Sequence, residues 1–302
     1  VAVGQSRRDE SAYGFILEQS WGSSGNMPEG PEIRRAADHL AAVLINEPIE
    51  EIAFAFPELQ RFGKLLRGAT VTEVETRGKA MLTHFDNDWV IYSHNQLYGV
   101  WKIARRGKLP ATRRSLRLAL HTSSHSALLY SASDISVWPR DEIGMHPFLA
   151  RLGPDLLSRP PQWREIATRL DEREFRGRAL GALYLDQGFL AGVGNYLRSE
   201  ILYAAQLHPS RRAQTLSRSE RGRLARESLA VTRRSYETGG ITLPPRLAAQ
   251  VRRASGAFER RRFFVFGRDG HQCYRCDDVI QRGSMGSRRI YWCPTCQSDS
   301  GP

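Results

Sequence analysis

The stretch Met27-Pro28-Glu29-Gly30-Pro31-Glu32 holds the residues best suited to covalent chemistry in this 302-residue chain. A proline at the start of a processed chain is a secondary amine, and an α-amine with a pKa of about 8 is nucleophilic near neutral pH. It condenses with an aldehyde to a cationic iminium, which promotes elimination at the neighbouring carbon. Glu29 and Glu32 offer carboxylates for proton transfer. A helix start with Pro31 in its first turn is a simpler interpretation, but it leaves Met27-Pro28 unexplained.

Pro28 is internal in this sequence, and the nitrogen of an internal proline is an amide with no lone pair to donate. Residues 1–26 are rich in glycine, serine and polar side chains without periodicity, which predicts a disordered extension. Met27 precedes a small proline that permits removal of the methionine. We therefore expect the working protein to begin at Pro28 and residues 1–26 to be absent from the mature chain.

Two cysteine pairs near the end of the chain have the spacing of a zinc ribbon, because 16 residues separate one Cys-x2-Cys motif from the next. We expect one structural Zn2+ and no organic cofactor. A closed four-thiolate site has no open position for substrate, so the metal would hold the fold. A redox pair and unligated thiols are the alternatives. The predicted ligands are Cys273, Cys276, Cys293 and Cys296.

The segment between the cysteine pairs predicts a β-hairpin, RGSMGSRRIYW, that carries basic and aromatic side chains. This combination suits contact with nucleic acid, and docking to another protein is the alternative. The side chains concerned are Arg282, Arg288, Arg289, Tyr291 and Trp292.

A second candidate for phosphate binding is the segment ALGALYLDQGFLAGVGNYLRSEILYAAQ, which predicts a helix, a glycine turn and a second helix. Gly192 and Gly194 allow a tight turn, and Asn195 stands where an N-cap is expected. The free amide groups of a helix N-terminus bind phosphate without regard to base sequence. Packing of two helices into a core is the alternative.

The elements that position these residues predict an α+β protein of two domains. One amphipathic helix follows Pro28, with apolar residues from Ile33 to Leu44 at helical spacing. Seven strand-like runs follow and predict an antiparallel β-sandwich or barrel: EIAFAF, VTEVETR, AMLTHF, WVIYSHN, GVWKIA, SLRLALHT and ALLYSA. The proline-rich segment MHPFLARLGPDLLSRPP predicts a hinge, and helical patterns run from Trp163 to about Glu237. The expected boundaries are 28–152 for the β domain, 153–262 for the hinge and helical domain, and 263–302 for the zinc-ribbon module.

Composition limits the class of protein. The 44 basic and 32 acidic residues give a net charge of +12, with +2 in residues 28–152 and +11 in residues 153–302. Such a basic half indicates a polyanion partner, although an Arg-rich solubilising surface is the alternative. Apolar runs stay far below the roughly 20 residues of a bilayer span, and four cysteines are too few for a disulfide scaffold.

Several motifs together resemble the formamidopyrimidine-DNA glycosylase/endonuclease VIII family: MPEGPEIRRAADHL, ETRGKAMLTHF, YSHNQLYGVW, DQGFLAGVGNYLRSEIL and the four-cysteine ribbon. The resemblance runs from Met27 to about Gln297. The segments NQLYG and GSRRIYWCPTC are more similar to bacterial endonuclease VIII than to the purine-directed branch. The resemblance implies an N-terminal β-sandwich with a leading helix, followed by a helix-two-turn-helix domain with a zinc ribbon.

The resemblance also implies catalytic roles for four residues, with Glu32 as possible support. Pro28 would attack C1′ of a damaged nucleoside and form a Schiff base, and Glu29 would act as general acid and base at the sugar. Lys79 would contact phosphate and assist β-elimination. Arg288 would serve δ-elimination and hold the phosphate beside the lesion.

The remaining implied roles concern DNA binding. Asn195 and Arg151 would hold backbone phosphates. Gln96, Leu97 and Tyr98 would enter the duplex and fill the gap left by an extruded nucleotide, which offsets part of the unstacking free energy. Without the resemblance, Lys79 would be read as a solvated charge and residues 96–98 as an ordinary hairpin.

These implications predict a bifunctional DNA glycosylase and abasic-site lyase that removes oxidised pyrimidines and cleaves the strand by β,δ-elimination. The expected partner is damaged double-stranded DNA, bound by a monomeric, cytoplasmic bacterial protein associated with the nucleoid and not with a membrane. The alternatives are a DNA-binding protein without a free amine, a glycosylase that prefers oxidised purines, and a zinc-ribbon transcription or ribosome factor.

Overall fold

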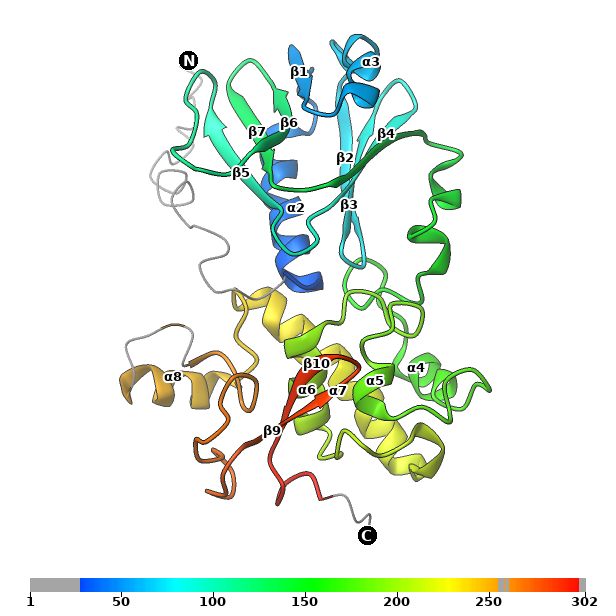
Figure 1. The fold of residues 1–302 in the computed structure, drawn as a ribbon, viewed down its shortest axis with the longest axis vertical. Coiled ribbons are helices and arrows are strands. Elements are labelled where there is room, and N and C mark those ends of the chain that lie inside the picture. The colour runs from blue at the N-terminus through cyan, green and yellow to red at the C-terminus, as the bar shows by residue number, and fades with distance from the viewer. Residues whose placement is uncertain (1–27, 255–257, 259–260, 299–302) are drawn as a thin grey trace, which may run out of the picture.

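The computed structural model describes residues 28–254, 258 and 261–298, and the predicted extension 1–26 lies outside them. Two halves lie one above the other, with the strands of the N-terminal half in the upper part of Figure 1 and most helices in the lower part. This arrangement confirms the predicted two-domain α+β fold.

The N-terminal half begins with helix α2 (Gly30–Leu44), whose buried side chains Ile33, Ala37, Leu40 and Leu44 recur at helical spacing. They pack into one core with the inward-facing residues of the strands. The predicted amphipathic helix is therefore confirmed, and it covers the interior of the strand layers.

Eight strands form two four-stranded antiparallel sheets, as the predicted sandwich requires. One sheet has the order β1-β6-β7-β5, and the other has the order β2-β3-β4-β8. Their bounds are β1 (Glu51–Phe54), β2 (Val71–Arg77), β3 (Ala80–Phe85), β4 (Trp89–His94), β5 (Val100–Arg105), β6 (Leu116–His121), β7 (His125–Tyr130) and β8 (Asp134–Pro139).

Two elements of this half were not predicted. Helix α3 (Pro57–Leu66) follows β1 directly, so the run EIAFAF ends as a strand at Phe54. Strand β8 completes the second sheet by pairing with β4. Its six residues are all half-buried, so it lacks the alternation of exposed and buried positions that identifies a strand in sequence.

The predicted hinge, residues 145–161, begins at the end of the short 3-10 helix η1 (Ile143–Met145), contains a second one, η2 (Leu149–Arg151), and then continues as an extended segment. The helical half follows, and most of its helices share one large apolar core with the ribbon. Their bounds are α4 (Trp163–Arg169), α5 (Leu180–Leu183), α6 (Asn195–Ala204), η3 (Ala213–Thr215), α7 (Arg218–Glu237) and α8 (Pro245–Ala254). Helix α8 lies in the Gly/Pro/Arg-rich stretch, where the sequence did not predict it.

Strands β9 (Gln281–Met285) and β10 (Arg288–Trp292) form the hairpin predicted between the cysteine pairs. Gly286 and Ser287 form its two-residue turn with φ values of 60° and 57°, as a type I′ turn requires. Figure 1 shows this hairpin beside α6. Arg198 of α6 donates a hydrogen bond to the Arg288 carbonyl at 3.3 Å, so the hairpin brings Arg288 to this helix.

Helices α2 and α7 join the two halves. Arg35 of α2 donates hydrogen bonds to the carbonyl oxygens of Ser235 and Tyr236 in α7, and the Tyr236 hydroxyl donates to Asp38 at 2.6 Å. None of the helices in the described part of the chain combines the length and apolarity of a bilayer span.

Candidate active site and metal centre

Glu29 belongs to the N-terminal half, yet its carboxylate binds the beginning of α6 in the helical half. Its oxygens accept hydrogen bonds from the backbone amides of Gly194 (2.8 Å), Tyr196 (2.7 Å) and Leu197 (3.2 Å). These amides lie at the N-terminus of the helix, where backbone donors lack partners within the helix. Glu29 therefore caps α6 from the other half of the molecule, and its side chain is 3% exposed.

This cap corrects the prediction that Asn195 is the N-cap. Gly194 holds that position with an extended backbone, and Asn195 is the first residue of the helix. A Cβ atom at Gly194 would lie 2.4 Å from the carboxyl carbon of Glu29. Only a residue without a side chain lets the carboxylate reach the amides, which explains why a serine or aspartate cap is not used here.

Charged groups from three separate elements act on one another around Glu29. Lys79 lies in the turn between β2 and β3, and Arg288 begins β10. Burial raises the pKa of Glu29 to about 7, and the Lys79 ammonium and the amides of Tyr196 and Leu197 oppose this shift. Burial lowers the pKa of Lys79, with Glu29 opposing the shift and Arg288 adding to it. The structure thus brings the predicted residues Glu29, Lys79 and Arg288 together.

Pro28 and Glu32 flank Glu29 in the described chain. Pro28 is half-buried and lies two residues before the start of α2. The Glu32 carboxylate accepts hydrogen bonds from the Glu29 amide (3.1 Å), the Tyr196 hydroxyl (3.0 Å) and Arg35 (3.2 Å). These contacts fix the backbone of Glu29 against both halves, so Glu32 is placed to support the site.

Arg198 was not predicted, although its guanidinium is fully buried at the centre of this region. It donates to the Asn195 side-chain oxygen at 2.8 Å and to the Arg289 carbonyl at 2.9 Å. Another nitrogen donates to the Gly181 carbonyl at 2.6 Å. Burial lowers the pKa of Arg198 to about 10. Its position between the apolar residues Leu197 and Ile201 on one helix could have identified it, because a buried arginine requires several acceptors.

The predicted wedge residues Gln96, Leu97 and Tyr98 lie between β4 and β5 and do not form an ordinary hairpin, because these strands belong to different sheets. Leu97 is 47% exposed and Tyr98 is 66% exposed. Gln96 has a φ of 49°, and its side-chain oxygen accepts from Ser133 at 2.6 Å. The loop thus presents two large apolar side chains to solvent on an ordered backbone.

Arg151 lies in η2, where its side chain is exposed and donates to the Pro147 carbonyl. Its predicted role in phosphate binding stays a prediction.

The four cysteines gather into one cluster, and none of them forms a disulfide with another. Their sulfur atoms are 3.4–3.8 Å apart in the close pairs. Tetrahedral zinc with Zn–S bonds of about 2.3 Å requires sulfur separations of about 3.8 Å, so the donor set fits the ion. The Tyr203 hydroxyl lies 3.2 Å from the Cys273 sulfur, and Gln297 links the Cys293 amide to the Leu207 carbonyl. A metal here would fix the hairpin to the helical core.

Comparison with known proteins identifies the family. Residues 27–133 match the formamidopyrimidine-DNA glycosylase N-terminal domain, and residues 152–245 match the formamidopyrimidine-DNA glycosylase H2TH domain. Endonuclease 8 of Klebsiella pneumoniae strain 342 is 48% identical over 271 residues, which are 90% of this chain and 100% of that protein. The chain belongs to the formamidopyrimidine-DNA glycosylase family. Membership confirms the resemblance and places the chain among the DNA-binding glycosylases of DNA repair.

Other relatives agree with this assignment. Endonuclease 8 of Pectobacterium atrosepticum is 46% identical over 272 residues, again 90% of this chain and 100% of that protein. Among solved structures, Lactococcus lactis Fpg bound to DNA containing an oxidized pyrimidine is 21% identical with a TM-score of 0.75. That match covers 90% of this chain and 100% of the other, and it confirms the glycosylase-family fold.

Proposed function

We propose that this protein is a bifunctional DNA glycosylase and abasic-site lyase that removes oxidised pyrimidines from double-stranded DNA. The observation that carries the proposal is the Glu29 carboxylate, which follows Pro28 directly, binds the amides that open α6, and interacts with Lys79. A nucleophile and a proton-transfer group that are adjacent in the chain thereby act together with a cation for phosphate from the turn between β2 and β3. The names of the relatives, Endonuclease 8, support the same activity.

The chemistry requires Pro28 to be the first residue. Its amine then attacks C1′, the bond from C1′ to the base breaks, and the departing base takes up a proton. The nitrogen loses a proton, the C1′–O4′ bond breaks with O4′ taking up a proton, and C1′ becomes an iminium. The iminium makes the C2′ proton acidic, so its removal expels the 3′ phosphate, and removal of the C4′ proton then expels the 5′ phosphate in a second elimination. We infer that Glu29 transfers protons at the sugar, because its pKa of about 7 allows it to be either acid or base at neutral pH.

The other residues bind the DNA. Lys79 and Arg288 hold phosphates around the reacting sugar, Asn195 and Arg151 hold further phosphates, and residues 96–98 fill the space of the extruded nucleotide. Exposed apolar side chains such as Leu97 and Tyr98 suit this insertion. A zinc ion on the four cysteines would hold Arg288 on its hairpin and take no part in the reaction.

Borohydride trapping tests the proposal. Two forms are compared on a duplex with thymine glycol, one beginning at Pro28 and one retaining residues 1–27, with the Glu29→Gln variant of the shorter form as control. We expect a covalent adduct with the unsubstituted form that begins at Pro28, and none with the longer form or with the Glu29→Gln variant. An adduct of equal yield with the longer form, verified by intact mass, would contradict the amine mechanism. Side-by-side excision of thymine glycol and 8-oxoguanine opposite each normal base tests the lesion class.

A further inference from the structure

The wedge loop, residues 95–99, is a tight turn whose two ends are buried and whose tip, residues 96–98, is exposed. The Gly99 amide donates to the Asn95 carbonyl at 2.7 Å and closes the turn. A Cβ at Gly99 would lie 2.5 Å from that carbonyl oxygen, so only glycine allows this closure. The turn therefore fixes the ends of the loop, and other contacts must hold its tip.

Packing does not hold the side chains at the tip. Leu97 and Tyr98 are 47% and 66% exposed, and neither belongs to an apolar cluster of the described residues. A side chain that enters a duplex must nevertheless keep its direction while it unstacks the bases. A loop that is already held in its bound conformation loses less conformational freedom on binding. Polar contacts to the backbone are therefore needed to prepare this loop for insertion.

Three polar contacts hold the tip of the wedge loop, each from a different residue. The Gln96 amide donates to the His94 Nδ1 atom at 3.0 Å, and the Ser133 hydroxyl donates to the Gln96 side-chain oxygen at 2.6 Å. Both of these contacts reach the first residue of the tip. A guanidinium nitrogen of Arg114 donates to the Tyr98 carbonyl at 2.5 Å and so holds the last residue.

Arg114 lies between β5 and β6, and its side chain is exposed. Its own amide donates to the Thr112 hydroxyl at 3.3 Å, which holds the backbone from which the side chain extends. Among the described residues, no carboxylate lies within ion-pair distance of the Arg114 guanidinium. The hydrogen bond to the Tyr98 carbonyl therefore accounts for the position of this side chain.

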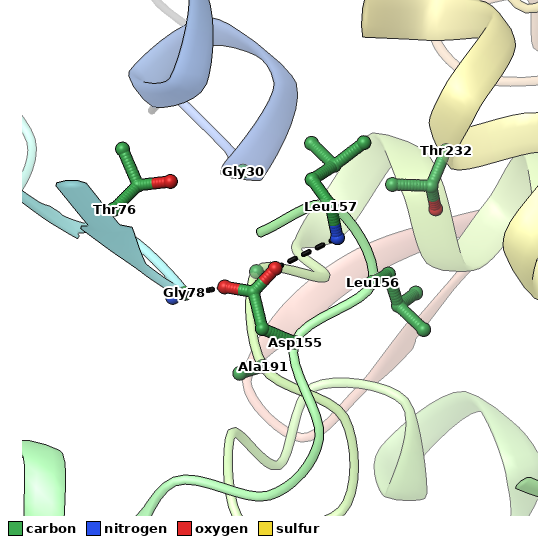
Figure 2. A pocket seen from close by; sticks show the side chains of 9 residues that line it. Gly30, Thr76, Gly78, Asp155, Leu156, Leu157, Ala191 and Thr232 are labelled. Carbon is green, nitrogen blue, oxygen red and sulfur yellow. Dashed lines mark hydrogen bonds between the residues drawn. The ribbon is translucent and has the colours of Figure 1, made fainter. Parts of the chain in front are cut away.

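The three contacts all come from the N-terminal half, unlike the contact that holds the turn of Lys79. Figure 2 shows that turn bound to the segment that follows the hinge, where the Gly78 amide donates to Asp155 at 2.6 Å. The contacts that hold the wedge loop thus do not depend on docking of the two halves.

We propose that Arg114 is a positioning residue for insertion into DNA, because it holds the Tyr98 peptide and thereby sets the direction in which Leu97 and Tyr98 leave the loop. This role rests on the proposed function, in which residues 96–98 fill the space of the extruded nucleotide. Arg114 acts through the Tyr98 backbone and leaves the Tyr98 side chain exposed for insertion.

Arg114→Ala is the direct test, with Arg113→Ala as the matched control. The two arginines are adjacent and exposed, and Arg113 has no hydrogen-bond acceptor among the described residues. With 2-aminopurine opposite thymine glycol, Arg114→Ala should reduce the rise in fluorescence on binding. Single-turnover excision should slow about fivefold, the size expected for the loss of one exposed hydrogen bond. Arg113→Ala should match the wild-type protein in both assays, and both variants should keep the wild-type Tm, because these are surface positions.

Two measurements separate positioning from phosphate binding and from a general loss of activity. The slope of log K against log salt concentration falls by about 1 when one phosphate contact is lost, so Arg114→Ala should keep the wild-type slope. In a Leu97→Ala/Tyr98→Ala background, the side chains that Arg114 positions are gone. Arg114→Ala should then cause no further loss of fluorescence or of excision.

Three results would overturn the role of Arg114. Arg114→Ala could behave like Arg113→Ala, its salt slope could fall by about 1, or its effect could be equally large in the Leu97→Ala/Tyr98→Ala background. In each case the wild-type protein still excises the lesion, so the proposed function survives. A wild-type protein that excises no thymine glycol and raises no 2-aminopurine signal overturns the proposed function and this role together.

Discussion

The contact between Gly194 and Glu29 gives a demanding test of the active-site geometry, the substitution Gly194→Ala. A methyl carbon there would lie 2.4 Å from the carboxyl carbon and 2.6 Å from the Oε1 atom of Glu29. The backbone at Gly194, with φ of −134° and ψ of −151°, is open to alanine, so any effect comes from the added carbon. Glu29 must move and lose amide hydrogen bonds of 2.7 and 2.8 Å.

The expected size follows from these contacts. A hydrogen bond to a charged group contributes about 1.5–3 kcal/mol, and an extra carbon forced into a packed site costs about 1–3 kcal/mol. We expect the free energy of unfolding to fall by about 3 kcal/mol and Tm by about 6–12 °C. Cleavage should fall by about 100-fold or more, because a positioned proton-transfer group contributes roughly 10²–10⁴ in rate.

Single-turnover strand cleavage and thermal unfolding, measured on the same preparations, check this prediction. Gly177→Ala is the control, since a Cβ there meets no described atom within 4 Å. In a Glu29→Ala background the atoms that the methyl would strike are gone, so Gly194→Ala should then leave Tm nearly unchanged. Wild-type cleavage by Gly194→Ala, or an equal loss of Tm in the Glu29→Ala background, would refute the reasoning.

Four further predictions concern separate parts of the site. Arg288→Ala should weaken the second elimination, seen as accumulation of the β-product on a gel, while Tm stays unchanged because an exposed charge contributes little stability; a large fall in Tm would make Arg288 structural. Cys293→Ser should release the metal, measured by atomic absorption, and abolish binding to lesion DNA, since ligation stabilises so small a module; retained binding would contradict this. Leu97→Ala should leave Tm unchanged and reduce the fluorescence of 2-aminopurine placed opposite the lesion, because the 47% exposed side chain contributes to insertion and not to the core; an unchanged signal would exclude Leu97 as the wedge. Burial raises the pKa of Glu29 from 4.5 to about 7, so its contribution to stability is complete below pH 4.5 and declines as the pH rises to 7. Urea unfolding should therefore show the stability of the wild-type protein falling relative to that of Glu29→Gln between pH 4.5 and 7. Equal pH dependence of the two stabilities would contradict the raised pKa.

Much of the fold could be predicted because each element has a local pattern. Period-two alternation and flanking turn residues identified seven strands, and the spacing from Ile33 to Leu44 identified α2. Strand β8 lacks that alternation, and α8 begins at the second of two consecutive prolines, in an Arg-rich stretch that resembles a loop. Strand β8 forms because it pairs with β4, and the local sequence carries no signal of this pairing.

The site could be predicted only where its residues belong to compact motifs. The cysteine spacing and the run after Pro28 are local, and the structure gathers the cysteines as expected. The contact of Glu29 with Tyr196 spans 167 positions, and that of Arg198 with Arg289 spans 91. Contacts between residues so far apart in the sequence leave no periodic pattern in a single sequence. The family resemblance supplied the roles of Lys79, Arg288 and Asn195, but it did not supply the means by which they are held.

The Glu29 carboxylate belongs to one half of the molecule and caps helix α6 in the other. The amides at the start of α6 therefore show whether the two halves are docked. Separation of the halves would release the amide protons of Tyr196 and Leu197 to solvent, so their hydrogen-exchange rates measure the fraction of molecules able to react. Substrate that favours the docked state should slow this exchange before any bond is broken. Conformational readiness can therefore be followed, residue by residue, without observing turnover.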